Sequence, residues 1–275
     1  DAGLRVSNSR QKILFDAKSL NLILNRDRKG MIKISSTASI FYQEYNSNIH
    51  TEFSFQPAQM EISGMLEFSE LRPDILVGLF SNNNNAKLLA IPMHGKANLS
   101  MSVDGKVKSL EFDITGGKGN ITSEHLVASL PVSSMQLRGN ISDHFTKASI
   151  DSLIMDMEGM KLLASGTANF FDTTTEPDAT PEIKADVLLK NVAGDNVKML
   201  WPTALSPLTR EWVTENISSG KISEAKLILD IKKGDLGKPI LPKESVDANI
   251  EIKDVKIRYL PEHPPATNVN GKIHI

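Results

Sequence analysis

Apolar and polar residues alternate with a period of two along most of the chain. Residues 97–103 read Ala-Asn-Leu-Ser-Met-Ser-Val, Asp104-Gly105 is a hairpin signal, and residues 110–114 resume the alternation as Leu-Glu-Phe-Asp-Ile. The same pattern predicts further strands at 20–24, 49–55, 62–68, 135–141, 164–170, 183–189, 225–231 and 246–252. One apolar and one polar face on each strand is typical of an antiparallel sheet with one solvated side.

Few helices are predicted. Ser206-Pro207 supplies an N-cap and a proline at the first helical position, so we expect a helix at about 207–218 that stops before Gly220. Two shorter helices are expected at about 195–201 and at 73–80. Three short helices cannot cover this many strands. A second sheet, the same sheet curled round, or a ligand must therefore cover the apolar faces.

Two segments of the chain align without a gap. Leu66–Phe80 reads LEFSELRPDILVGLF, and Val187–Trp201 reads VLLKNVAGDNVKMLW. The chain is therefore interpreted as two related strand–helix–meander units, at about 60–145 and 183–275. The predicted domains are 1–59 as N-terminal strands, 60–182 as the first unit with its helix, and 183–275 as the second.

Composition excludes several classes of function. Hydrophobic residues make up 40% of the 275 and charged residues 23%, which excludes wholesale disorder. The near balance of 31 basic and 33 acidic residues argues against a nucleic-acid groove, and 5% aromatics are too few for stacking platforms. Cysteine is absent, so thiolate chemistry is ruled out. The chain begins at Asp1 without a signal peptide or an apolar run long enough to span a membrane, so we expect a soluble piece of a longer protein.

Residues that could carry catalysis form no recognisable constellation. The histidines at 50, 94, 125, 144, 263 and 274 have no metal-ligand spacing, and we interpret each as a surface or strand-edge residue. Residues 116–119 (Gly-Gly-Lys-Gly) lack the spacing of a phosphate loop and predict a glycine-rich turn. The carboxylates of Asp151, Asp156 and Glu158 fit the wet face of a strand, although an acid/base pair stays open. Trp201 and Trp212 are interpreted as core anchors.

Residues 200–220 resemble a segment of a known protein family. The segment LWPTALSPLTREWVTENISSG, followed by the 225–231 strand and a segment ending Tyr-Leu-Pro at 259–261, resembles the core of the YhdP-like branch of AsmA-like bacterial envelope proteins. The matching positions are Trp201, Pro202, Trp212, Gly220, Tyr259, Leu260 and Pro261. Residues 89–95, 107–119 and 130–139 look similar as well, so the likeness covers most of 50–275.

The resemblance implies a specific fold and function. Members of this family are thought to form long, taco-like β-grooves that are anchored in the inner membrane and move phospholipids across the periplasm to the outer membrane. We therefore expect a mostly β chain whose extended, strongly curved antiparallel sheet holds acyl chains, without catalysis or cofactor. Possible partners are phospholipid acyl chains and envelope proteins, with no nucleic acid. Membrane contact would come through parts of the parent chain that lie outside this sequence.

Groove-lining residues follow from the apolar positions of the predicted strands. They are Ile62, Leu66, Phe68, Ala97, Leu99, Met101, Val103, Leu110, Phe112, Ile114, Met135, Leu137, Ile141, Ala164, Ala168, Phe170, Ile183, Val187, Leu189, Ala225, Leu227, Leu229, Ile231, Ala248, Ile250 and Ile252. The same residues would form the core of a filled sandwich, because both architectures require the same alternation. Two alternative functions stay open: a structural or assembly scaffold that binds protein partners through a closed β-array, and a β-rich hydrolase.

Overall fold

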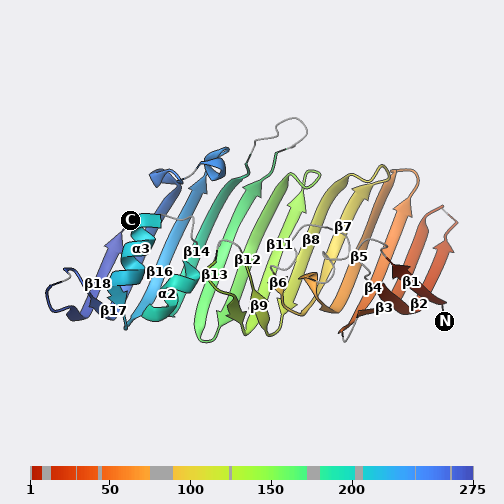
Figure 1. The fold of residues 1–275 in the computed structure, drawn as a ribbon. Helices are drawn as coiled ribbons and strands as arrows, with labels where there is room; N and C mark the ends of the chain where they lie inside the picture. The colour runs from red at the N-terminus through yellow and green to blue at the C-terminus, as the bar shows by residue number, and fades with distance from the viewer. Residues whose placement is uncertain are drawn as a thin grey trace. The chain divides into compact units, whose positions relative to one another are not determined.

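A computed structural model describes residues 2–7, 14–28, 30–42, 45–74, 89–123, 126–171, 180–201, 207–238, 240–260 and 262–274. The protein is mostly β, as the alternation predicts (Figure 1). It contains a large antiparallel sheet with a path of 14 hydrogen-bonded strands and β18 as a further neighbour of β17. Three short strands, β6, β9 and β10, form a second sheet.

Apart from residues 103 and 170, the predicted segments fall within strands, and the structure adds strands that were not predicted, such as 32–42. Their bounds are β1 Ala2–Ser7, β2 Leu14–Arg26, β3 Ile32–Tyr42, β4 Tyr45–Gln56, β5 Glu61–Leu71, β6 Leu89–Ala90, β7 Met93–Ser102, β8 Val107–Gly116, β9 Gly119–Ile121, β10 Leu130–Val132, β11 Ser134–Ser142, β12 Lys147–Met157, β13 Met160–Asn169, β14 Glu182–Ala193, β15 Ile217–Ser218, β16 Lys221–Ile231, β17 Val246–Ile257 and β18 Ala266–His274. The Asp104-Gly105 signal falls in the turn between β7 and β8, so that hairpin is confirmed.

The chain divides into two compact units. The first comprises Asp1–Gly119 and Gln136–Ala148, and the second comprises Asn120–Met135 and Ser149–Ile275. These divisions differ from the three segments expected from the sequence, which stay a prediction.

In the first unit, strand register gathers the predicted apolar positions on one face. Strands β1 to β5 pair in chain order, and β5 pairs with β7, which pairs with β8. Leu66 lies opposite Ala97, and Ala97 lies opposite Phe112. Because directly opposed residues share a face, these side chains form a row across three strands. Neighbouring rows contain Gly64 with Leu99 and Leu110, and Phe68 with Gly95 and Ile114.

In the second unit, β13, β14, β16 and β17 are consecutive antiparallel neighbours. One row contains Leu189 of β14, Ala225 of β16 and Ile250 of β17. The next row contains Val187, Leu227 and Ala248. Strand β17 also pairs with β15 and β18. The described helices of this unit are α2 (Val197–Leu200) and α3 (Pro207–Asn216), with 3₁₀ turns η2 (Gly194–Asn196), η3 (Asp235–Gly237) and η4 (Lys243–Ser245).

Both helices of the second unit were predicted, and their ends differ slightly from expectation. The helix expected at 195–201 begins as the 3₁₀ turn η2 and continues as α2. Helix α3 begins at Pro207 and ends at Asn216, because Ile217 and Ser218 pair with β17 instead. Of the helix expected at 73–80, Pro73 and Asp74 are helical, and the remainder lies outside the described residues.

The interpretation of Trp212 as a core anchor is wrong. Trp212 is 48% exposed, and Leu208 on the same helix is exposed as well. The reason is the side chain of Arg210, whose Nε donates to the carbonyl oxygen of Trp201 and whose Nη2 donates to that of Lys198, both at 3.2 Å. These bonds satisfy carbonyls at the end of α2, and they turn the Arg210 side of α3 inward. Trp212 therefore faces outward.

The two aligned sequence segments share a backbone feature. Glu70 in β5 has φ 56° and Asn191 in β14 has φ 58°, and these two residues occupy the same position in the alignment. Each lies just before the end of its strand, and each strand is followed by a helical turn. A left-handed residue inside a strand changes the direction of the following side chain, since it breaks the simple alternation of faces. Val192 consequently lies buried at 1% exposure.

Candidate functional site

The candidate site is an apolar cavity of about 590 Å³ in the second unit. Its floor is the apolar face of β14, β16 and β17, and five of the predicted groove residues form it: Leu189, Ala225, Leu227, Ala248 and Ile250. Its other walls come from β14 and β16 (Val192, Ile222), from α2 and its end (Val197, Leu200, Trp201), from α3 (Thr209), and from the segment before β17 together with the first residue of that strand (Ile240, Leu241, Pro242, Lys243, Val246). The volume lies within the range of about 300–1,000 Å³ that is usual for small-molecule sites.

Small residues on the floor create the space. Ala225 is 4% exposed and Ala248 is 5% exposed, so both are covered, yet neither fills the volume above it. Their row neighbours are the larger Leu189, Leu227 and Ile250. Since an interior position with a methyl side chain leaves room that a leucine would occupy, the two alanines set the depth of the cavity.

The helical wall begins at a tight backbone junction. The amide of Gly194, at the start of η2, donates to the carbonyl oxygen of Gly220 at 3.0 Å. A Cβ at Gly194 would lie 2.3 Å from the carbonyl oxygen of Ser219, and Gly220 has φ 67°. Glycine is required at both positions, because one needs close approach and the other a left-handed conformation. The junction ties the end of β14 to the turn before β16.

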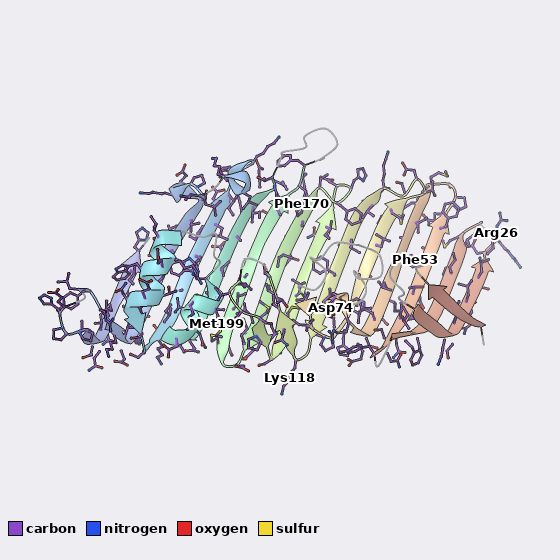
Figure 2. All side chains as sticks on the ribbon, viewed as in Figure 1. Arg26, Phe53, Asp74, Lys118, Phe170 and Met199 are labelled. Carbon is purple, nitrogen blue, oxygen red and sulfur yellow. The ribbon has the colours of Figure 1, made fainter. Side chains whose placement is uncertain are left out.

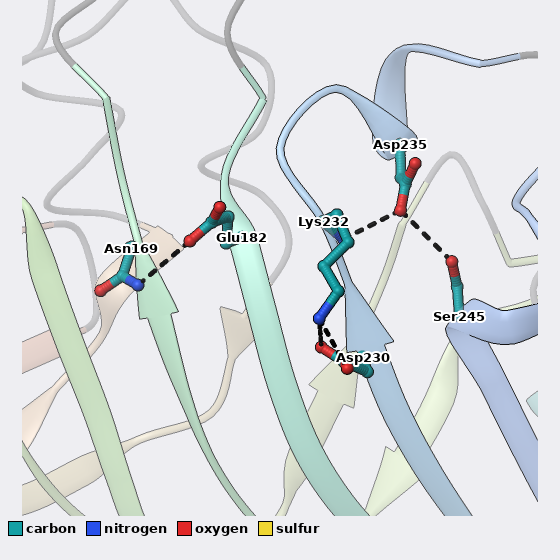
Figure 3. Close-up of polar contacts among 6 residues, drawn as sticks. All are labelled: Asn169, Glu182, Asp230, Lys232, Asp235 and Ser245. Atoms are coloured by element: carbon teal, nitrogen blue, oxygen red, sulfur yellow. Dashed lines mark hydrogen bonds and ion pairs between the residues drawn. The ribbon is translucent and has the colours of Figure 1, made fainter.

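A polar cluster holds the segment between β16 and β17 that supplies the remaining wall (Figure 3). Asp235 is 5% exposed, and its Oδ2 accepts bonds from the amide of Lys232 at 2.9 Å and from Ser245 Oγ at 3.3 Å. Lys238 Nζ lies 2.7 Å from Asp235 Oδ1. Hydrogen bonding from Lys238, then from the Lys232 amide, lowers the pKa of Asp235 below its ordinary value of 3.8. The ionised carboxylate therefore fixes η3 to η4 at neutral pH.

Other predicted lining residues of the second unit share this face without reaching the cavity. Ala164 lies opposite Val187, and Ala168 lies opposite Ile183. Leu229 lies opposite Ala185 and Val246, Ile231 lies opposite Ile183, and Ile252 lies opposite Ile222. Phe170 follows the last residue of β13 and is exposed (Figure 2). Met135 is buried in the Ser134–Ser142 strand.

The first unit gathers the remaining predicted residues on the apolar face of its own strands. Ile62 lies opposite Met101. The row of Leu66 contains Ala97 and Phe112. Leu110 lies in the row of Leu99, and Ile114 lies in the row of Phe68. Leu137 and Ile141 lie in β11 and are half-buried. Val103 lies in the turn after β7 and is exposed, so the strand does not carry it onto the face.

The predicted lining residues leave out part of this face, although the strand that carries it was predicted. Phe53 lies opposite Gly64, and its Cδ1 occupies the space 2.2 Å from where a Cβ of Gly64 would be (Figure 2). Phe55 and Ile49 of the same strand lie opposite Ile62 and Phe68. The alternation at 49–55 contained this signal, and register with β5 shows that it belongs to the same surface.

A second hollow lies on the polar face of the first unit. It measures about 670 Å³ and is open, and its lining combines polar residues such as His50, Glu67, Lys96 and Asp113 with the apolar residues Ala38, Ile49 and Phe68. Arg138 Nη2 lies 2.9 Å from Asp113 Oδ2, and His50 Nε2 lies 3.4 Å from Glu52 Oε1. These are exposed ion pairs of a solvated sheet face, and such pairs contribute little to stability.

The residues considered for catalysis have structural partners. His94 Nε2 lies 3.1 Å from Glu70 Oε1, and His144 Nδ1 lies 3.0 Å from the carbonyl oxygen of Val107. Asp156 Oδ1 accepts from the Gly159 amide in the turn after β12, and Asp151 Oδ1 accepts from Ser149 Oγ. His125 lies outside the described residues. Within the described ranges, no three His, Asp or Glu side chains gather as a metal site.

The glycine-rich turn predicted at 116–119 is shorter in the structure: Gly116 ends β8, Gly119 begins β9, and only Gly117 and Lys118 connect the two strands. Gly117 donates to the carbonyl oxygen of Pro92 at 3.0 Å, and a Cβ at Gly119 would lie 2.2 Å from the carbonyl oxygen of Ala90. Lys118 between them is exposed (Figure 2). These glycines serve close backbone packing.

Comparison with protein-family models, with curated proteins and with solved structures gives no match. The family resemblance therefore depends on the quoted residues alone. Among the described helices, none has the length and apolar character to cross a membrane.

Proposed function

We propose that this chain is a section of a bridge-like phospholipid transport protein in the bacterial periplasm, with acyl chains held on the apolar face of its sheet. The parent protein would be anchored in the inner membrane, and the sheet would curl into a groove that leads toward the outer membrane. The observation that carries the proposal is the cavity of the second unit. Its floor consists of apolar residues from three strands that the register places on one face.

The chemistry of the face suits an acyl chain. Removing a methylene from water is favourable by about 0.8 kcal/mol, and aliphatic side chains provide that environment without directional bonds. A chain could therefore move along rows such as Val187, Leu227 and Ala248 without breaking hydrogen bonds. The headgroup would stay in water at the rim, because burying an unpaired charge costs several kcal/mol or more. No covalent step is needed.

The apolar rows of the first unit support the same role. Leu22 and Leu24 of β2 are each 63% exposed, and Leu24 lies opposite Ile34 of β3. Ile34 lies opposite Phe53, which lies opposite Gly64. An apolar face that continues over several strands and stays partly accessible is the surface that a groove requires.

A closed scaffold is the second candidate, and one observation favours it. Ala225, Ala248, Ile231 and Ile252 of the second unit are all buried, so protein atoms already cover much of this face. Such a face could be the core of an assembly protein that binds partners elsewhere. The two functions differ in whether the cavity holds lipid.

Native mass spectrometry with lipid extraction tests the proposal on chain purified from a bacterial envelope. We expect bound phospholipid in the wild type and its loss in Leu227→Asn, because Leu227 lies on the cavity floor. The matched control is Ile228→Asn, since Ile228 is the next residue of β16, faces the opposite side and is exposed. Circular dichroism and thermal unfolding would verify that both variants fold. A well-folded wild type without lipid would refute transport and favour the scaffold.

A further inference from the structure

Lys243 is the one charged residue among the described residues that line the apolar cavity. Apart from Thr209, the other described lining residues are apolar. Lys243 is also exposed, so it belongs both to the lining and to the surface. Because a lysine stem packs along apolar surface while its ammonium stays in water, this geometry places the positive charge at the mouth of the cavity.

The backbone beneath Lys243 is held in place. Lys243 begins η4, and the amide of Ser245 donates to the carbonyl oxygen of Pro242 at 3.0 Å. Ser245 is 1% exposed and its hydroxyl lies 3.3 Å from Asp235 Oδ2. The position of the lysine at the mouth is therefore fixed by a buried polar contact two residues further along the chain.

Neighbouring cations already have partners, whereas Lys243 makes no ion pair within the described part of the chain. Lys238 pairs with Asp235. Lys232 Nζ lies 2.7 Å from Asp230 Oδ2, as Figure 3 shows. Arg210 donates to two backbone carbonyl oxygens. The charge of Lys243 is thus available to a ligand that occupies the cavity.

We propose that the cavity binds an amphiphile with an aliphatic chain and an anionic end group, with the chain against the floor and the end group paired with Lys243. This inference rests on the proposed function and specifies its ligand in the second unit. An ion pair at an exposed mouth contributes modestly, whereas burial of the chain supplies most of the affinity. The site would therefore select among amphiphiles by the charge of the end group.

Titration of the full chain with laurate and with lauryl alcohol, at a pH where laurate is ionised, tests the inference. The two probes have the same chain and differ in the charge of the end group. We expect laurate to bind about two- to fivefold more tightly, with a preference that falls as salt rises. Lys243→Gln should remove the preference, so that laurate and lauryl alcohol bind this variant with equal affinity. Lys226→Gln is the matched control, because Lys226 lies beside Leu227 on the opposite, polar face of β16.

The outcomes separate the inference from the function on which it rests. Equal affinity of the wild type for both probes, or a preference that survives in Lys243→Gln, would overturn the role of Lys243 and leave chain binding intact. Binding of neither probe would overturn both the anionic site and the proposed lipid-binding function.

Discussion

The two units use the same strand pattern and fill their apolar faces differently. In the first unit, the row of Leu66 and Ala97 also contains Phe112, and Phe53 covers Gly64 in the next row. In the second unit, Ala225 lies between Leu189 and Ile250, and an apolar cavity lies above it. Strand alternation decides which residues share a face, whereas side-chain volume decides whether that face is filled or hollow.

The hollow regions also differ in chemistry. The described hollow of the first unit has a mixed lining, in which charged and polar residues such as His50 and Lys96 accompany Ile49 and Phe68. The cavity of the second unit lies over leucine, isoleucine and alanine, beneath α2, α3 and the segment before β17. The second unit therefore provides the better-defined site for an apolar ligand.

The largest expected difference between the units is in the stability lost when a buried alanine of each apolar face is replaced by leucine. Ala97 and Ala225 are both buried alanines in the middle of a three-residue row. Ala97→Leu should destabilise the protein by about 1–3 kcal/mol, since Phe112 and Leu66 already occupy the space. Ala225→Leu should cost less than about 1 kcal/mol, because its side chain enters the cavity. Chemical denaturation measures both free energies of unfolding.

Ligand binding provides the second half of that test. Ala225→Leu should lower the affinity for lauryl alcohol, since the new side chain occupies the binding volume, whereas Ala97→Leu should leave it unchanged. Equal destabilisation by the two substitutions, together with unchanged binding, would show that the volume above Ala225 is not a ligand site.

Much of this fold could be predicted from the sequence, because local pattern determines it. The alternation at 97–103 and the Asp104-Gly105 turn specify a hairpin without knowledge of any distant residue. Ser206-Pro207 similarly predicts where α3 begins. The predicted floor residues share a face because a period of two places them there once the strands pair.

The cavity itself could not be predicted, because it depends on contacts between distant segments. Whether Ala225 leaves a hollow depends on its neighbours in β14 and β17, and register alone supplies them. The burial of Asp235 against Ser245 is a tertiary contact between residues ten positions apart, and no local pattern encodes it. The outward position of Trp212 follows from the bonds of Arg210 to the end of α2, which helical spacing does not encode.

A fall in pH should weaken ligand binding to the cavity of the second unit, because Asp235 holds one of its walls. The pKa of Asp235 is lowered, so its contribution to stability is present above the ordinary value of 3.8 and is lost as the pH falls below it. We expect affinity for lauryl alcohol, which does not titrate, to hold above about pH 4 and to fall as the pH drops further, because the segment that carries Lys243 then loosens. Asp235→Asn should show the weaker affinity already at pH 7.

The control for this effect is a carboxylate of the first unit. Hydrogen bonding from Ser102, then from Lys106, lowers the pKa of Asp104 to about 2, and Asp104 lies in the exposed turn between β7 and β8. Asp104→Asn should leave the affinity and its pH dependence as in the wild type. A pH-independent affinity in the wild type would exclude Asp235 as the group that holds the cavity wall.

The smallest expected effect concerns the shared left-handed residues, Glu70 and Asn191. A left-handed conformation costs most side chains about 1–2 kcal/mol, and asparagine tolerates it better than glutamate. Glu70→Gly should therefore raise the free energy of unfolding by about 0.5–1 kcal/mol, because the exposed pair of Glu70 with His94, which this variant loses, contributes little. Asn191→Gly should raise it by less, because asparagine tolerates the left-handed conformation better. Thermal and chemical denaturation of both variants measure the difference. A larger gain at Asn191 would show that the two aligned positions carry different strain, and that the match between the segments stops at the level of sequence.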